Sequence, residues 1–370
     1  MLTLYLLIIS LSLISSWLIL WRVPLIKESL FVDMPERKLS IIIPARNEAQ
    51  NLPILLKSLA IQKRRPFEIL VVDDASDDKT AQVATDYGAQ VITFLRDESN
   101  WLGKSAACWA GAQVAKVDYL LFLDADVFLS QENSLSKLIN EFQKQNEQGI
   151  LSVQPYHIVE KGYENFSTIF NIIVLVGMNR FSFFQNKVKA VGAFGPSLLV
   201  KRDAYFKVGG HARSREAMMD HVELGKLFLE DGLTVNLFGG KNTLNFRMYP
   251  DNLEDLSQGW SKSFATASLS THPLIIIGIS LLIAGAFFSF YFPIYFIVTS
   301  QWLATSISLV GYLVFFGHFY RMARLAGNFH WQFLIAYPIL FIFFVGLFTW
   351  SLIKTHIFRQ VSWKGRDISL

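Results

Sequence analysis

The residues best suited to chemistry are aspartates that follow apolar stretches of the chain. Asp73 and Asp74 follow "EILVV", and Asp124 and Asp126 follow "YLLFL". Two carboxylates spaced two residues apart suit Mg²⁺ or Mn²⁺, which prefer hard oxygen ligands and commonly bridge a diphosphate. An Asp-x-Asp pair is a weak signal alone, because turns after strands often hold acids. The second acid pair strengthens the interpretation.

A further group of candidates lies at 216–232, where Asp220 stands beside His221 at the start of an amphipathic segment. A carboxylate next to an imidazole suits proton transfer, although an acid in the first turn of a helix also stabilises the helix dipole. Lys104 in "GKSAA" is another candidate. A Walker A interpretation of that string fails, because the motif needs glycine where the chain has Glu98. Lys104 is still able to meet a phosphate as a point charge, with an ordinary surface lysine as the alternative.

These residues need a scaffold, and residues 39–150 alternate short apolar runs with amphipathic stretches. We predict strands over 39–44, 67–76, 89–95 and 118–127, and helices over 48–62, 78–88 and 104–115. Continuous apolar strands between helices are typical of an α/β fold with a mostly parallel sheet covered on both faces. Such sheets bind ligands beyond the carboxyl ends of their strands, which is where the four aspartates fall.

The 370-residue chain is 52% hydrophobic, and its long apolar segments lie near its two ends. Residues 2–21 carry no charge over about 30 Å of helix, and we expect an uncleaved anchor there. Residues 274–298, 302–320 and 333–353 are further candidate spans. The predicted parts are a membrane anchor at 1–23, a soluble domain at 38–265, a transmembrane region at 272–355 and a tail at 356–370 that contains "WKGR".

Charge predicts the orientation of a multi-pass protein of the cell membrane. Arg22 and Lys27 predict that the soluble domain is cytoplasmic, and basic residues in the loop 321–332 and in the tail predict the same side. Four full crossings do not satisfy all three assignments, so we expect one apolar stretch to be re-entrant or interfacial. The net charge of +4 is spread along the chain, so no nucleic acid partner is expected. The single Cys108 excludes a disulfide within the chain.

Ordered sequence strings resemble family 2 glycosyltransferases, which have the GT-A fold. The strings are "IIIPARNE", "VVDDASDD", "GKSAACWAG", "FLDADV", "GGH" and "DHVELG", and they cover about 39–265. The strings "GILSVQPYHI", "FGP", "FRMY", "GWSK" and "WKGR" resemble a narrower group, the membrane glycosyltransferases of staphyloxanthin-type carotenoid synthesis. The resemblance implies a GT-A domain at 38–265 and an inverting, metal-dependent transfer of glucose from UDP-glucose to a lipophilic acceptor.

The resemblance also implies roles around the donor. The implied nucleotide-sugar contacts are Pro44, Arg46, Glu48, Asp73, Asp74, Lys104 and Asp124. Asp74 would meet the uracil and Lys104 the diphosphate. Asp124 and Asp126 would hold Mg²⁺ or Mn²⁺, which would neutralise the departing UDP.

The acceptor side departs from the processive members of the family, which carry Gln-x-x-Arg-Trp. Residues 258–262 are a shorter variant, which argues against a polymerising synthase. Arg247, Gln258 and Trp260 remain candidate contacts for acceptor or sugar, with packing as the alternative. The apolar segment 163–184 is interrupted by polar residues, so we expect an interfacial or core helix there rather than a span.

The family usually has Glu-Asp where this chain has Asp220-His221, and the second acid is the usual base. Three explanations stay open: His221 acts as the base, Asp220 reaches in instead, or no strong base is needed. An alcohol acceptor must lose a proton as it attacks, whereas a carboxylic acid of pKa about 4–5 is already ionised at pH 7. The altered pair therefore favours a carboxylate acceptor, such as the apocarotenoid 4,4'-diaponeurosporenoate, and a glycosyl ester product.

Rival hypotheses keep the same class of enzyme and change the acceptor to diacylglycerol, a hopanoid or a polyprenyl phosphate. A rival from another class is a transporter or membrane scaffold with a degenerate soluble domain. That hypothesis leaves the ordered aspartates unexplained.

Overall fold

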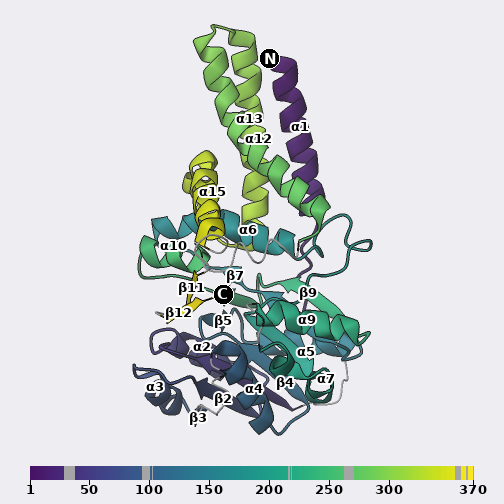
Figure 1. Ribbon diagram of the computed structural model, residues 1–370, viewed down its shortest axis with the longest axis vertical. Helices are drawn as coiled ribbons and strands as arrows, with labels where there is room; N and C mark the ends of the chain where they lie inside the picture. Colours follow the sequence, from purple (N-terminus) through teal and green to yellow (C-terminus); the bar gives the residue numbers. More distant parts are fainter. Residues whose placement is uncertain are drawn as a thin grey trace. The chain divides into compact units, whose positions relative to one another are not determined.

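Figure 1 shows a computed structural model of the chain. It describes residues 1–28, 38–93, 101, 103–215, 217, 219–261, 271–354, 360–363 and 366–369. The chain forms two compact units, each assembled from separated stretches of sequence. Unit 1 comprises Met1–Val23, His157–Ala190 and Met248–Leu370, and unit 2 comprises Pro24–Tyr156 and Val191–Arg247. The domain boundaries expected from the sequence stay a prediction.

Unit 2 contains a seven-stranded sheet in the order β3-β2-β1-β4-β8-β6-β9. Its strands are β1 (Leu39–Ala45), β2 (Glu68–Asp73), β3 (Gln90–Thr93), β4 (Tyr119–Leu123), β6 (Ile150–Gln154), β8 (Ser197–Lys201) and β9 (Val235–Gly239). Only β8 runs antiparallel to its neighbours, β4 and β6, among the strands that the structure describes. The predicted mostly parallel sheet is confirmed. The predicted strands correspond to β1, β2, β3 and β4, and the end of the third, at 94–95, lies outside the described residues.

Helices and a smaller sheet complete the fold around these strands. The helices are α2 (Leu52–Ala60), α3 (Thr80–Asp86), α4 (Lys104–Val114), α5 (Ser134–Lys144), α7 (Arg202–Lys207), α8 (Gly210–Arg213) and α9 (Asp220–Glu230), and the smaller sheet has the order β5 (Val127–Leu129), β10 (Leu244–Phe246), β7 (Tyr156–His157). α4 packs on β1 and β2. A Cβ on Gly111 would lie 2.5 Å from Cγ2 of Ile42, so this glycine permits the close approach of helix and sheet.

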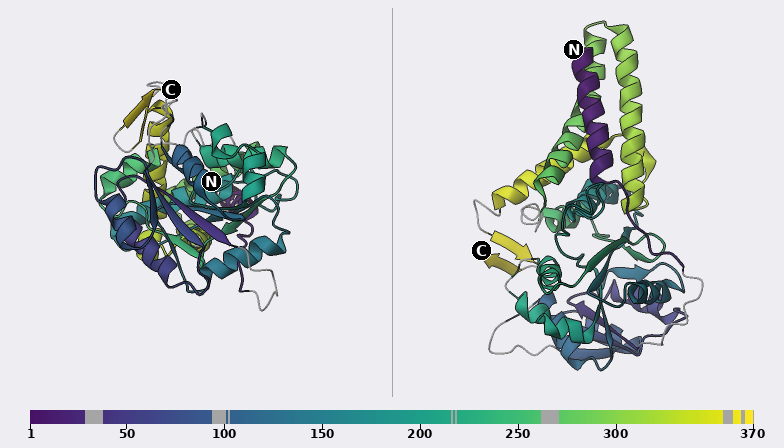
Figure 2. Two further views of the ribbon diagram at one scale, coloured as in Figure 1. Left: turned by 90° about the horizontal axis from the view of Figure 1, so that it is seen from below. Right: turned by 90° about the vertical axis from the view of Figure 1, so that its right-hand side faces the viewer.

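Unit 1 contains the apolar helices. Three helices within the described ranges are long and apolar enough to cross a membrane: α1 (Leu2–Ile19), α12 (Pro273–Val298) and α13 (Trp302–Ala326). α1 contacts both of the others, and Figure 2 shows the three running side by side. The fourth predicted stretch, 333–353, is divided between α14 (Trp331–Leu334) and the 17-residue α15 (Tyr337–Ile353). At 1.5 Å per residue α15 is about 25 Å long, shorter than a typical hydrocarbon core of about 30 Å.

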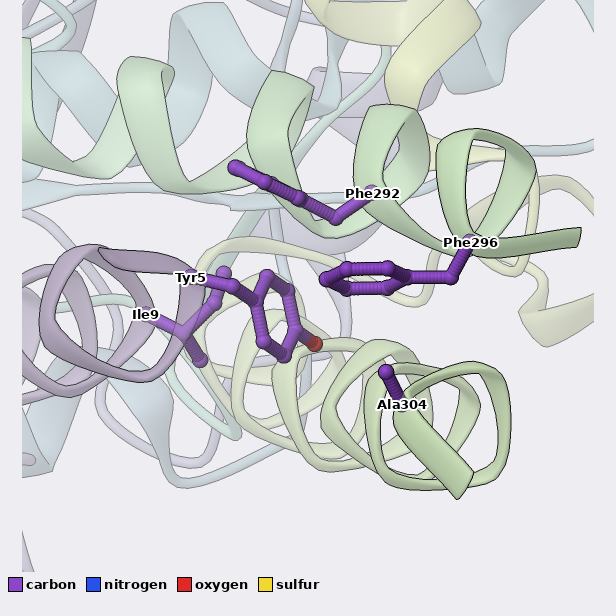
Figure 3. Close-up of a cluster of buried hydrophobic side chains, with 5 residues drawn as sticks. All are labelled: Tyr5, Ile9, Phe292, Phe296 and Ala304. Atoms are coloured by element: carbon purple, nitrogen blue, oxygen red, sulfur yellow. The ribbon is translucent and has the colours of Figure 1, made fainter. Parts of the chain in front are cut away.

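A buried cluster joins α1, α12 and α13 (Figure 3). Its members are Tyr5, Ile9, Phe292, Phe296 and Ala304. The rings of Tyr5 and Phe292 have centroids 5.3 Å apart. The Tyr5 hydroxyl donates to the carbonyl oxygen of Ser308 at 2.9 Å. A hydroxyl inside an apolar bundle needs such a partner, because no water is available to it there.

Unit 1 also contains shorter helices and a two-stranded sheet. These elements are η1 (Gly162–Ser167), α6 (Thr168–Gly177), α10 (Leu253–Ser261), β11 (Gln360–Trp363) and β12 (Arg366–Ser369). α6 contacts α12, α13 and α15, and most of its side chains are buried. With 10 residues α6 is too short to span a bilayer, as the sequence predicts for 163–184. Lys262 and the middle of "WKGR" lie outside the described residues.

Candidate active site

The candidate site lies at the carboxyl ends of β1, β2 and β4 in unit 2. Ala45 pairs with Asp73 in the register of β1 and β2, and Asp124 directly follows β4 on the other side of β1. The Asp124 N–H donates to the carbonyl oxygen of Pro196 at 3.1 Å, which ties this turn to the start of β8. The three strands are parallel, so the predicted aspartates emerge at the same edge of the sheet, as sequence reasoning expects.

The predicted nucleoside contacts lie where β1 and β2 end. Pro44 belongs to β1, and Arg46 follows that strand. Nη1 of Arg46 donates to the carbonyl oxygens of Asp74 at 2.7 Å and Ala75 at 3.1 Å. These two bonds fasten the loop after β1 to the loop after β2. Asp73 is buried and accepts a hydrogen bond from the Ser76 hydroxyl, and Asp74 is also buried.

Lys104 begins α4 and lies against Asp124. Its Nζ is 2.6 Å from Oδ1 and 2.8 Å from Oδ2 of Asp124, and it donates to the carbonyl oxygen of Gly195 at 3.0 Å. The contacts with Oδ2 of Asp124 and with the Gly195 carbonyl oxygen are hydrogen bonds. Burial alone would lower the pKa of Lys104, but the carboxylates of Asp124 and Asp220 raise it above its ordinary range. Lys104 is therefore a permanent cation beside the predicted metal ligands.

Asp126 is the carboxyl group whose ionisation is hindered at this site. Burial raises its pKa to about 7, reinforced by the charges of Asp124 and Glu48 and opposed by Lys104. Carboxylates that repel one another are a donor set for a hard divalent cation, so these side chains fit Mg²⁺ or Mn²⁺. Within the described residues no group of three or more His, Cys, Asp or Glu side chains is placed to hold a metal ion. Asp124 and Asp126 would therefore need further oxygen ligands from the donor.

Asp220 and His221 are the first residues of α9. Oδ1 of Asp220 accepts from the backbone N–H of His221 at 2.8 Å and lies 3.3 Å from Nδ1 of its ring. Burial would raise the pKa of Asp220, but the hydrogen bond from His221 and the charge of Lys104 lower it well below its ordinary range. Asp220 therefore stays ionised. Because Asp220 lies beside Nδ1 of the His221 ring, the other ring nitrogen, Nε2, is the one left to interact with a ligand.

Glycines allow α4 and α9 to meet at this point. A Cβ on Gly192 would lie 2.5 Å from the carbonyl oxygen of Val222, so α9 can approach only because that side chain is missing. A Cβ on Gly195 would lie 3.0 Å from Nδ1 of His221 and 3.3 Å from Nζ of Lys104. Gly195 therefore adjoins both functional side chains. Sequence reasoning gave it no role, and the only signal was the string "FGP".

A buried tyrosine–histidine pair lies in α7 and α8, also in unit 2. The Tyr205 oxygen accepts from the backbone N–H of His211 at 3.1 Å and lies 2.8 Å from Nδ1 of the same residue. Burial lowers the pKa of His211 to about 4, so its ring is neutral at pH 7. Sequence reasoning noted "GGH" only as part of the resemblance and missed Tyr205.

Arg247 directly follows β10 of the smaller sheet. Phe246, the last residue of β10, pairs with Val127, which directly follows Asp126. The antiparallel pairing ends at this pair of residues, and Arg247 and Asp126 are the next residues beyond it along the chain. Its predicted contact with acceptor or sugar stays a prediction.

Gln258 and Trp260 lie in unit 1, on α10. Gln258 is exposed and donates to Glu254 at 3.1 Å. Trp260 is buried, donates from Nε1 to the Ser167 hydroxyl at 3.0 Å and stacks on Phe170 with centroids 4.9 Å apart. This packing is the alternative that the sequence leaves open for Trp260. A contact of either residue with acceptor or sugar stays a prediction.

The sheet, the acids at its carboxyl edge and the apolar helices define a glycosyltransferase of GT-A fold that is able to associate with a membrane. Residues 40–209 match glycosyl transferase family 2. The chain is 36% identical over 340 residues to 4,4'-diaponeurosporenoate glycosyltransferase of Staphylococcus aureus strain MRSA252, covering 92% of this chain and 90% of that protein. The protein of the same name from strain USA300 is 35% identical over 340 residues, with the same coverage of both proteins. The chain therefore belongs to glycosyl transferase family 2.

More distant similarity is found among solved structures. Glucosyl-3-phosphoglycerate synthase from Mycobacterium tuberculosis, solved with Mn²⁺, UDP-glucose and phosphoglyceric acid, is 15% identical with a TM-score of 0.44, covering 67% of this chain and 87% of that chain. S. aureus TarS is 18% identical with a TM-score of 0.41, covering 69% of this chain and 44% of that chain. Scores at this level carry no argument about the site, so the family membership rests on the sequence comparisons.

Proposed function

We propose that the protein transfers glucose from UDP-glucose to the carboxylate of an apocarotenoid such as 4,4'-diaponeurosporenoate, with inversion at the sugar, and forms a glycosyl ester. The observation that carries this proposal is the convergence of Lys104, Asp124 and His221 around Gly195 at the carboxyl edge of the sheet. Ligands of α/β sheets bind at this edge. A relative 36% identical to the chain is named for this acceptor.

The donor would lie across the ends of β1, β2 and β4. Pro44, Arg46 and Glu48 would frame the nucleoside, with Asp74 on the uracil and Asp73 supporting it. The hydrogen bonds from Arg46 to the carbonyl oxygens after β2 support this assignment, because they hold both loops in place before any ligand binds.

Charge at the diphosphate would be balanced by residues that the sheet and α4 present. Asp124 would meet the ribose, and together with Asp126 it would hold Mg²⁺ or Mn²⁺, which when bound neutralises charge on the departing UDP. Lys104 would contact the diphosphate as a compact cation. The raised pKa of Lys104 keeps that ammonium charged throughout the physiological pH range.

The chemistry of the acceptor accounts for Asp220-His221. A carboxylate acceptor has no proton to lose near neutral pH, so transfer to it needs no strong base. Asp220 is a poor base because its lowered pKa makes it hold a proton weakly. We therefore assign Asp220 to orienting His221, and His221 to positioning the acceptor. An alcohol acceptor would instead require His221 to remove its proton.

The membrane arrangement that we propose has three crossings. α1 enters the cytoplasm, which places Arg22 and Lys27 inside, and α12 and α13 form a hairpin that brings Arg321 back to the inner side. α15 stays at the inner surface, as its shorter length allows. The tail is then cytoplasmic as well. This arrangement satisfies the three charge assignments that four crossings violate.

The test is transfer by the purified full-length protein in lipid nanodiscs. UDP-glucose and UDP-galactose are each supplied with diaponeurosporenoate, diacylglycerol, a hopanoid or a polyprenyl phosphate, and products are identified by mass spectrometry. We expect a glucosyl apocarotenoid that mild base cleaves, as esters are cleaved and glycosides are not. The double variant Asp124→Asn, Asp126→Asn should form none. Product only with another acceptor would refute the carotenoid assignment, and UDP binding unaffected by the double variant would refute the site.

A further inference from the structure

The Lys104 side chain contacts Asp124, which the proposed function assigns as a metal ligand. Nζ of Lys104 contacts both oxygens of Asp124, at 2.6 and 2.8 Å, and it donates a hydrogen bond to the carbonyl oxygen of Gly195. A divalent cation needs at least one of those Asp124 oxygens. The ammonium group and a divalent cation therefore compete for the same carboxylate oxygens.

We propose that Lys104 is a built-in counter-ion that exchanges positions with the metal. Without ligands it neutralises Asp124. When the nucleotide binds, Lys104 moves from Asp124 to the diphosphate and leaves the aspartate oxygens to the metal. This inference rests on the proposed function, which supplies both the diphosphate and the metal.

The local chemistry supports such a movement. The charge of Asp124 helps to raise the pKa of Asp126, so a cation beside Asp124 offsets negative charge at this edge of the sheet when no metal is present. The lysine side chain is a flexible four-carbon stem carrying a compact charge. It is 30% exposed, and Gly195 beside Nζ has no side chain to block its path. The ion pair with Asp124 therefore holds Lys104 in place, and the partial exposure and flexibility of its side chain allow it to move to another anion.

The exchange makes metal and nucleotide depend on each other in a specific way. With no nucleotide, Lys104 and the metal compete for Asp124, so metal binding is weak. With nucleotide present, the diphosphate offers Lys104 new oxygens and the competition ends. Metal and donor therefore bind cooperatively.

The experiment measures Mn²⁺ binding to the full-length protein by calorimetry, first with Mn²⁺ alone and then with UDP, for wild type and Lys104→Met. The variant has no ammonium to displace, so Mn²⁺ alone should bind it more tightly than wild type, on the order of tenfold. The same variant has lost a diphosphate contact, so UDP with Mn²⁺ should bind it about tenfold more weakly. Opposite changes in the two affinities are the signature of exchange.

Lys207→Met is the matched control. Lys207 also pairs with an aspartate, at 2.8 Å from Oδ2 of Asp231, and its side chain is exposed; both affinities should stay at the wild-type value. If Lys104→Met does not fold, as its melting curve shows, Lys104→Gln removes the same charge with a smaller change in polarity. Mn²⁺ binding to the folded variant that is equal to or weaker than wild type, without nucleotide, overturns the exchange. Absence of Mn²⁺-dependent UDP binding in the wild type defeats the proposed function instead, while the Mn²⁺-only comparison still decides the exchange.

Discussion

The raised pKa of Asp126 predicts how the free energy of unfolding should change with pH. That pKa is raised from 3.8 to about 7 by burial and by Asp124 and Glu48. An acid whose pKa is higher in the folded chain favours folding when it is protonated. This contribution is fully present below about pH 4 and is lost as the pH rises through about 7. Asp126→Asn removes the titrating group, so its stability advantage over wild type should grow from pH 5 to pH 8.

The size of the effect follows from the pKa difference. About three pKa units at about 1.4 kcal/mol each set a ceiling of roughly 4 kcal/mol at pH 8. Because Asp126 is partly exposed, we expect about 1–2 kcal/mol after screening by solvent. The measurement is denaturant unfolding of the full-length protein with a chelator present, at pH 5, 6.5 and 8.

Asp78 provides a control of opposite sign. Burial would raise its pKa, but hydrogen bonds from Thr80 and from the backbone N–H of Ala49 lower it below the ordinary value. Stability from Asp78 is therefore present near neutral pH and is lost only as the pH falls through the lowered pKa. Asp78→Asn should be less stable than wild type at pH 8. An Asp126→Asn variant no more stable than wild type at pH 8, or one whose advantage shrinks as the pH rises, would contradict the charge arrangement described here.

Variants at three further positions test the roles of individual residues. His221→Ala should slow transfer to an apocarotenoid carboxylate by less than about tenfold, but transfer to an alcohol acceptor by roughly 10²–10⁴-fold; equal losses in initial rate with both acceptors would exclude this assignment. Gly195→Ala brings a Cβ to 3.0 Å from Nδ1 of His221 and 3.3 Å from Nζ of Lys104, and displacement of the Lys104 ammonium should lower kcat by about 10²-fold while the melting temperature changes little; an unchanged kcat would show that the contact is harmless. Trp260→Ala should cost roughly 3–5 kcal/mol of stability in unfolding experiments because it leaves a cavity beside Phe170. A stable Trp260→Phe variant should keep its rate, and a large loss would favour a substrate contact over packing.

Local sequence patterns predict the strands and helices of the catalytic sheet well. Continuous apolar runs locate β1, β2 and β4, and the acids that follow them are at the predicted edge. The ion pair of Lys104 with Asp124 and the role of Gly195 are not predictable in this way, because 91 residues separate Lys104 from Gly195 and only the folded chain brings them together. The pairing of Tyr205 with His211 is similarly hidden, since periodicity indicates burial and not hydrogen-bond partners.

The membrane segments show a different limit of sequence patterns. Four stretches of the sequence are similarly apolar, so hydropathy alone does not show that the last of them forms a helix shorter than the other three. Pro338 supplied a signal that composition ignores, because proline is favoured in the first turn of a helix and disfavoured further along. It lies in the first turn of α15, which separates that helix from α14 and shortens the apolar stretch.

The discontinuity of unit 1 has a consequence for how the protein is made. Roughly 250 residues separate the end of α1 from the start of α12. At a synthesis rate of 5–20 residues per second, α1 waits on the order of ten to fifty seconds for the helices it packs against. During that interval the Tyr5 hydroxyl lacks its Ser308 acceptor. Assembly of this membrane bundle therefore waits for the synthesis of α13, and a nascent chain arrested before α13 would leave the Tyr5 hydroxyl in an apolar environment without its acceptor.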